Sequence, residues 1–176
     1  AATMPAITAS NWAPLTRWGL GYEVFLAQMS HSDNIAYGTD TTSGEPQLGG
    51  LQLTATPASG WSIGVNRLVQ YGGGLRGGSS LGEVLRALFN PHGEDNVNSG
   101  AAPNSDEGNQ LASFTSRMLF QGRTPFAVYF EFAGEDTSHT SNYRLGNAAL
   151  AAGIDLPLLP HGLDATYEVT EWQNGW

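Results

Sequence analysis

The stretch from residue 109 to residue 136 contains two runs in which apolar and polar side chains alternate. Successive side chains on a β-strand point to opposite faces, so a repeat of two residues places the apolar side chains on one face. A short connection with a glycine and a proline, residues 121–125, separates the two runs, as an antiparallel hairpin requires. The pattern therefore predicts a hairpin with one apolar face and one mixed face. Its apolar positions are Ala112, Phe114, Met118 and Phe120 in the first run and Phe126, Val128, Phe130 and Phe132 in the second.

The register of this hairpin follows from the same pattern. If Phe120 lies opposite Phe126, the apolar side chains of both strands share a face, whereas a shift by one residue places phenylalanines opposite polar side chains. On the mixed face this register puts Thr115 opposite Glu131 and Arg117 diagonally from Glu131. We therefore expect either an Arg117–Glu131 ion pair, which would line the lumen of a barrel, or two solvated side chains.

Alternation of the same kind recurs along the rest of the chain. It predicts further strands over residues 6–14, 18–29, 48–56, 61–71, 143–156 and 163–172, of which the first has the weakest pattern. The connections after residues 56, 120 and 156 are short. They alternate with long polar loops, predicted at about residues 30–47, 90–108 and 134–142, of which the first could also contain a strand extension.

One stretch changes from the strand repeat to a helical repeat. A serine followed three residues later by a glutamate, Ser80 and Glu83, is a capping-box signal for the start of a helix. The signals predict one short helix at about residues 80–89. Its apolar positions, which recur at helical spacing, are Leu81, Val84, Leu85, Leu88 and Phe89.

The arrangement of turns and strands points to a membrane protein. Short turns at one end, long loops at the other, and strands of about 9–12 residues with one apolar face are typical of outer-membrane β-barrels. A soluble β-sandwich also has alternating strands. Here, however, the side chains on the polar face are small and mostly uncharged, as those that line a water-filled lumen would be. We therefore expect an all-β fold, an antiparallel transmembrane β-barrel that takes up residues 1–176 as a single unit. Aromatic residues near the predicted strand ends, typical of an interfacial belt, are Trp18, Trp61, Tyr71, Phe120, Phe126, Tyr143 and Trp172.

The composition excludes several classes of function. The chain has a formal charge of −9 and no lysine, which argues against a protein that binds nucleic acid. It has no cysteine, which excludes disulfides, thiol catalysis and cysteine-based zinc sites. The glycine-rich run 72–80 resembles a phosphate-binding loop but lacks the lysine of a P-loop. The histidines have no metal-ligand spacing and no Gly-x-Ser-x-Gly motif is present, so we expect no catalytic residue, cofactor or metal.

Two Gly-Glu-Asp triplets, residues 93–95 and 134–136, fall in the predicted long loops. Their carboxylates have the chemistry to bind Ca²⁺, to accept hydrogen bonds from sugar hydroxyls, or to carry out acid–base glycoside hydrolysis. The pattern favours the simpler interpretation that they are solvated loop acids next to strand ends.

A series of runs occurs in a specific order along the chain: NRLVQYGGG with SLGEVLRALF, then GEDN, GNQLASFTSRMLFQGRTPFAVYFEFAGED, NYRLGNAAL and TYEVTEWQNGW. Their order and spacing, from about Trp12 onward, resemble the Wzi family of outer-membrane capsule-assembly proteins. The resemblance implies a closed antiparallel barrel of about eighteen strands in the outer membrane of a Gram-negative bacterium, with helices that help to occlude the extracellular opening. It also implies a non-enzymatic, lectin-like role in which the protein binds capsular polysaccharide and helps to attach the capsule to the cell surface.

About seven or eight strands are predicted here, so the resemblance implies that the chain is part of a larger barrel. The alternatives are a complete small eight-stranded outer-membrane barrel and a soluble β-sandwich that acts as a lectin or glycosidase. For the larger barrel, the expected partners are capsular polysaccharide and outer-membrane lipid. Polysaccharide contacts are expected on the long loops and the helix, where arginine can pair with acidic sugars. The candidates are Arg76, Arg86, Glu94, Asp95, Glu135, Asp136, Asn142 and Arg144.

Overall fold

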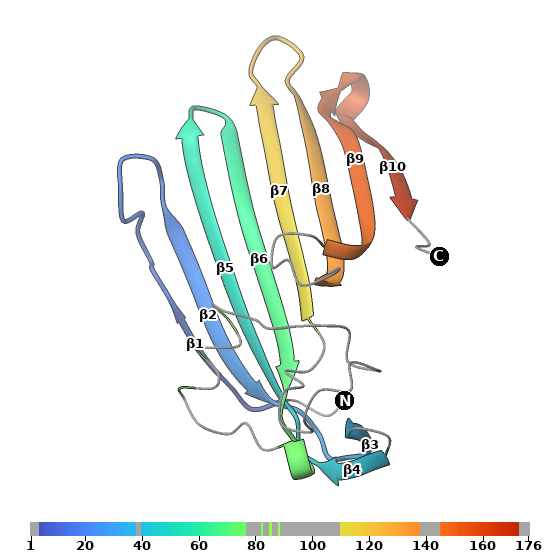
Figure 1. The fold of residues 1–176 in the computed structure, drawn as a ribbon. Helices are drawn as coiled ribbons and strands as arrows, with labels where there is room; N and C mark the ends of the chain where they lie inside the picture. The colour runs from blue at the N-terminus through green and yellow to red at the C-terminus, as the bar shows by residue number, and fades with distance from the viewer. Residues whose placement is uncertain are drawn as a thin grey trace.

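The computed structural model describes residues 4–37, 40–76, 82, 85, 88, 110–137 and 145–172. Within these residues, eight strands form one antiparallel sheet in the order β1-β2-β5-β6-β7-β8-β9-β10, and β3 and β4 form a separate hairpin (Figure 1). The predicted all-β antiparallel fold is therefore confirmed. The strands are β1 (Ala6–Ser10), β2 (Gly21–Gln28), β3 (Ser32–Tyr37), β4 (Asp40–Gly44), β5 (Gln47–Ala58), β6 (Trp61–Tyr71), β7 (Gln110–Phe120), β8 (Phe126–Thr137), β9 (Leu145–Leu159) and β10 (Leu163–Trp172).

The register of the β7–β8 hairpin is the one that the hydrophobic pattern predicts. Phe120 pairs with Phe126 and Thr115 pairs with Glu131. The rings of Phe120 and Phe126 stack with their centroids 4.7 Å apart. Because cross-strand neighbours share a face, the same register brings the apolar side chains of both strands to one side of the sheet.

The up-and-down order separates the connections into two groups. One end of the sheet, called the turn end here, carries the connections 11–20, 59–60, 121–125 and 160–162, the last of which is the 3₁₀ turn η2 (Pro160–Gly162). The opposite loop end carries the connections 29–46, 72–109 and 138–144. The β3–β4 hairpin occupies part of the predicted loop 30–47, and β8 continues to Thr137, past the predicted start of the loop 134–142.

Three consecutive glycines redirect the chain at the loop end. Gly72, Gly73 and Gly74 all have positive φ, at 67°, 92° and 58°, a region that side chains with a Cβ rarely adopt. The backbone therefore leaves β6 in a sharp turn and enters η1 (Gly74–Arg76). The backbone N–H of Leu75 then donates a 3.1 Å hydrogen bond to Oγ1 of Thr42 on β4, which ties this turn to the β3–β4 hairpin.

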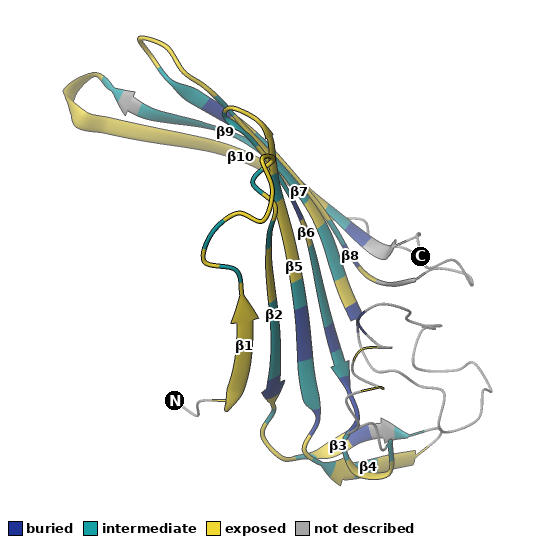
Figure 2. Ribbon diagram, turned by 90° about the vertical axis from the view of Figure 1, so that its left-hand side faces the viewer, coloured by how far each residue is buried: buried dark blue, intermediate teal, exposed yellow. Residues whose placement is uncertain are grey.

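The two faces of the eight-stranded sheet differ in chemistry. Cross-strand pairing places most of the large apolar side chains on one side of the sheet, which is called the apolar face here. Much of this face is exposed, including Val65 at 49% and Leu53 at 41%. Figure 2 shows that exposed residues also cover β1 and β10 along their length. The apolar face includes Tyr22, Leu53, Ile63, Val65, Phe114, Met118, Phe120, Phe126, Val128, Phe130, Phe132, Leu150, Ile154, Tyr167 and Val169.

The buried core lies on the apolar face near the loop end. Val69, Tyr71 and Leu88, at 1%, 4% and 3% exposure, pack together. Partly buried apolar side chains of β2 and β5 pack around them. Leu88 belongs to the predicted helix 80–89. That helix and the loop 90–108 fall mostly outside the described residues, but Gly82, Leu85 and Leu88 have helical conformation.

The sheet has two open edges. Among the described residues β1 pairs with β2 alone and β10 pairs with β9 alone. As described, the eight strands of this sheet therefore do not close into a small eight-stranded barrel. They form a single layer that is compatible with part of a larger barrel.

In the part of the chain that the structure describes, no helix has the length and hydropathy needed to cross a membrane.

Candidate functional site

The polar face of the sheet contains a groove of about 530 Å³ near the turn end. Register pairing places alternate residues of β5 to β9 on this face, opposite the apolar face. Hydroxyl and charged side chains predominate among the residues of this face that line the groove. They are Thr54, Thr56, Ser62, Gly64, Thr115, Arg117, Tyr129, Glu131 and Asp155.

A glycine between two threonines forms the floor of the groove. Gly64 of β6 pairs with Thr54 of β5 on one side and with Thr115 of β7 on the other. A Cβ on Gly64 would lie 2.6 Å from Oγ1 of Thr115, which is closer than such atoms approach in a packed structure. The absence of a side chain at this position therefore creates the hollow and lets the flanking hydroxyls face it.

One ion pair crosses the groove. Nη2 of Arg117 lies 3.3 Å from Oδ2 of Asp155, and their side chains are 48% and 28% exposed. Thr166 of β10 donates from Oγ1 to Oδ1 of the same aspartate at 3.0 Å. Asp155 thus accepts hydrogen bonds on both oxygens, which fixes the orientation of its carboxylate.

The partner of Arg117 differs from the one that the sequence predicts. We expected either an ion pair with Glu131, which is on the adjacent strand β8 and also lines the groove, or two solvated side chains. The structure instead pairs the arginine with Asp155 on β9, one strand further away. The cross-strand neighbour of Asp155 on β8 is Ala127, whose side chain is small and fully buried. A long arginine side chain can therefore reach past β8 to the carboxylate of Asp155.

A second polar contact spans three strands next to this pair. Oη of Tyr129 on β8 donates a 2.7 Å hydrogen bond to Oε2 of Glu168 on β10. The residue between them on β9 is Gly153, which pairs with both. Because glycine has no side chain, the tyrosine ring can lie across β9 and reach the glutamate. The sequence alone does not identify this contact, since it depends on the register of three strands.

The predicted polysaccharide contacts are not brought together by the described residues. Arg76 ends η1 and is partly exposed, and Glu135 is exposed on β8, opposite Leu111. Asp136 lies on the same strand, and its side chain is not among those that the structure describes. The other candidates, Arg86, Glu94, Asp95, Asn142 and Arg144, lie outside the described residues. Within the described part of the chain, no cluster of three or more histidine, aspartate or glutamate residues could hold a metal ion.

Comparison with known proteins gives one match. A family model described as capsule assembly protein Wzi matches residues 4–174, almost the whole chain. No curated protein and no solved structure matches the sequence significantly.

Proposed function

Because the chain belongs to the Wzi family of capsule assembly proteins, we propose that it acts in the outer membrane of a Gram-negative bacterium. Its role there is non-enzymatic: it binds capsular polysaccharide and helps to attach the capsule to the cell surface. The observation that carries this proposal is the family match over residues 4–174, and the two faces of the sheet supply a physical basis for it.

The apolar face supports contact with outer-membrane lipid. Strands β5, β6, β7 and β8 have 12, 11, 11 and 12 residues, and a tilted strand of about 9–11 residues crosses a bilayer. Their exposed phenylalanine, leucine and valine side chains form a continuous apolar surface, which soluble monomers rarely present. A β-sandwich would cover this surface with a second large sheet, whereas the eight paired strands of the sheet described here form one layer.

The polar face and the loop end support contact with a polysaccharide. In outer-membrane barrels the long loops are extracellular and the short turns are periplasmic, so the loop end would face the capsule. Arginine side chains there, such as Arg76 and Arg144, would pair with acidic sugars through two parallel hydrogen bonds. The loop acids Glu94 and Glu135 would accept hydrogen bonds from sugar hydroxyls.

Binding without catalysis is favoured by the hydrogen bonds of the groove carboxylates. Asp155 accepts from Arg117 and Thr166, and Glu168 accepts from Tyr129. A glycosidase needs one carboxyl group that carries a proton to donate to the leaving group. Both oxygens of Asp155 instead already accept hydrogen bonds, from Arg117 and Thr166, an arrangement that suits an acceptor of hydrogen bonds better than an acid catalyst.

The proposal is tested with the detergent-solubilised protein and capsular polysaccharide from a producing strain. We expect the wild-type protein to bind the polysaccharide, as measured by calorimetry. The double variant Glu94→Ala/Glu135→Ala should fold normally but bind the polysaccharide at least several-fold more weakly. Asp164→Ala, an exposed acid beside the turn end, is the matched control and should bind normally. The proposal fails if the wild-type protein does not bind the polysaccharide and cells that lack the protein retain their capsule.

A further inference from the structure

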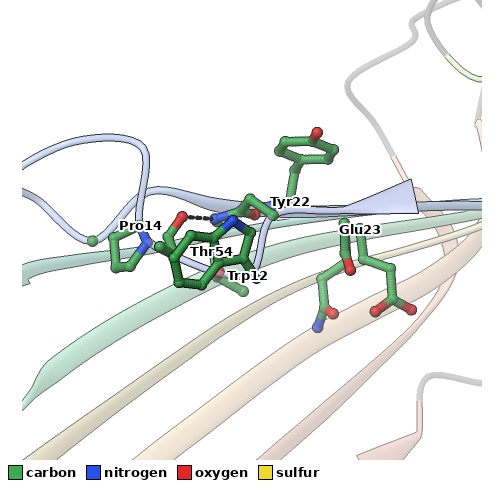
Figure 3. A pocket seen from close by; sticks show the side chains of 11 residues that line it. Trp12, Pro14, Tyr22, Glu23 and Thr54 are labelled. Atoms are coloured by element: carbon green, nitrogen blue, oxygen red, sulfur yellow. Dashed lines mark hydrogen bonds between the residues drawn. The ribbon is translucent and has the colours of Figure 1, made fainter. Parts of the chain in front are cut away.

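A second hollow, of about 320 Å³, lies where the connection between β1 and β2 meets the polar face. Figure 3 shows Tyr22 and Glu23 on opposite sides of β2, with Glu23 beside the hollow. Trp12 is also part of its lining, and this side chain is 99% exposed. A tryptophan with almost no contact to the rest of the described protein presents a large flat ring to whatever occupies the hollow.

The backbone around Trp12 is held in place. Oδ1 of Asn11 accepts a 2.5 Å hydrogen bond from the backbone N–H of Tyr22, and its Nδ2 donates to the carbonyl of Ala13 at 2.7 Å. The asparagine therefore fixes the chain on both sides of Trp12 and ties it to β2. The exposed ring stands on an ordered support, which lowers the entropy that a ligand must overcome to contact it.

The two hollows adjoin at one residue, and together they are called the trough here. Thr54 lines both of them. It pairs with Gly21 of β2 and with Gly64 of β6, so the floor between the hollows is built from glycine and threonine. From β2 to β9 the trough crosses six neighbouring strands of the sheet, which is about 24 Å at the usual strand spacing. Its length suits an extended chain molecule better than a compact one.

The charge of the trough selects the class of ligand. Its acidic side chains are Glu23, Glu131 and Asp155, with Glu168 beside them, and its only described basic side chain is Arg117, which Asp155 already neutralises. A polyanion would be repelled here, because the carboxylates outnumber the guanidinium group. Hydroxyl groups of an uncharged sugar would instead donate charge-assisted hydrogen bonds to these carboxylates.

From this geometry we propose that the trough binds an uncharged stretch of a saccharide chain, with Trp12 stacked on one sugar ring at its β1–β2 end. The proposal rests on the proposed function and adds a second contact for the polysaccharide, separate from the long loops. Thr54 and Thr115 hydrogen-bond to hydroxyls at the centre, and Glu131 and Asp155 accept hydrogen bonds at the far end. The acidic sugars of the same polysaccharide bind instead to arginines at the loop end.

The test is calorimetric titration of the detergent-solubilised protein with neutral hexasaccharides of glucose, galactose and mannose and with hexagalacturonate. We expect at least one neutral hexasaccharide to bind, and hexagalacturonate to bind at least tenfold more weakly. Trp12→Ala should weaken the binding of the neutral hexasaccharide about tenfold or more, and Thr54→Tyr, which fills the junction of the hollows, should abolish it. Trp18→Ala is the control, because Trp18 is exposed on the same connection but lines neither hollow.

The outcomes separate this proposal from the proposed function. If capsular polysaccharide binds but no neutral hexasaccharide does, or if Trp12→Ala and Trp18→Ala bind the neutral hexasaccharide equally well, the trough proposal is wrong and the loop-end site is retained. Tighter binding of hexagalacturonate than of every neutral hexasaccharide would also overturn it. If neutral hexasaccharides bind as expected but capsular polysaccharide does not bind and the capsule is retained without the protein, the trough stands and the proposed function fails.

Discussion

The ring of Tyr129 lies over a glycine of the neighbouring strand, so a single methyl group at Gly153 should disturb the polar face. A Cβ there would overlap the tyrosine hydroxyl and would lie 2.8 Å from the backbone oxygen of Tyr167, which cannot move aside. Replacing glycine by alanine gains at most about 1 kcal/mol through the unfolded chain, whereas overpacking costs about 1–3 kcal/mol. We therefore expect Gly153→Ala to lower the urea midpoint of unfolding in micelles. Gly122→Ala is the control, because nothing lies within 4 Å of a Cβ at that position. Equal urea midpoints for Gly153→Ala and Gly122→Ala would contradict the packing argument.

For single residues, the sequence predicts which face of the sheet a side chain occupies better than it predicts which side chains it contacts. The alternation placed Arg117 and Glu131 on the polar face and gave their register correctly. It could not identify Asp155 as the partner of Arg117, because that choice depends on a third strand and on the small side chain of Ala127 between them. The hollow at Gly64 was missed for the same reason, since its depth depends on Thr54 and Thr115 from both neighbouring strands.

At the scale of whole elements, Leu88 joins the segment after β6 to the sheet, because its side chain packs against Val69 and Tyr71 of β6. Removing most of a buried leucine side chain costs about 2–5 kcal/mol, and 2 kcal/mol corresponds to roughly thirtyfold in the equilibrium for local opening. We therefore expect Leu88→Ala to speed hydrogen exchange at the amides of Val69 and Tyr71 by that factor or more. Leu85→Ala changes the same segment at a side chain that is 45% exposed and should leave their exchange nearly unchanged. If both variants exchange alike, Leu88 does not dock the segment.

Strands were easier to predict from the sequence than the connections. β6 and β10 have the predicted bounds, because a repeat of two over about ten residues leaves little choice of register or length. The β3–β4 hairpin falls within a predicted loop, because its segments SDNIAY and DTTSG are mostly polar and carry no hydrophobic repeat. The positive φ angles at Gly72, Gly73 and Gly74 give a structural reason for the glycine-rich run, which the sequence alone could also assign to a phosphate-binding loop.

For the whole molecule, the assignment of faces decides how the protein sits in a bilayer. The apolar face would contact lipid and the polar face would contact water, so two adjacent residues of one strand should respond in opposite ways to the same charge. Leu53 lies on the apolar face and is 41% exposed, and Gln52 precedes it on the polar face of β5. An arginine that faces lipid near the bilayer midplane costs about 2–4 kcal/mol, and one that faces the lumen costs little.

We therefore expect Leu53→Arg to reduce the folded fraction strongly when the protein is refolded into lipid vesicles, while Gln52→Arg folds like the wild type. The folded fraction is measured by the shift in gel mobility between unheated and heated samples. Helix-forming or strand-forming tendency cannot explain a difference, because the same residue is introduced at neighbouring positions of one strand. Equal folding of both variants would show that the apolar face is not in lipid. Impaired folding of Gln52→Arg alone would reverse the two faces, and the trough would then lie on the lipid side, where no saccharide could reach it.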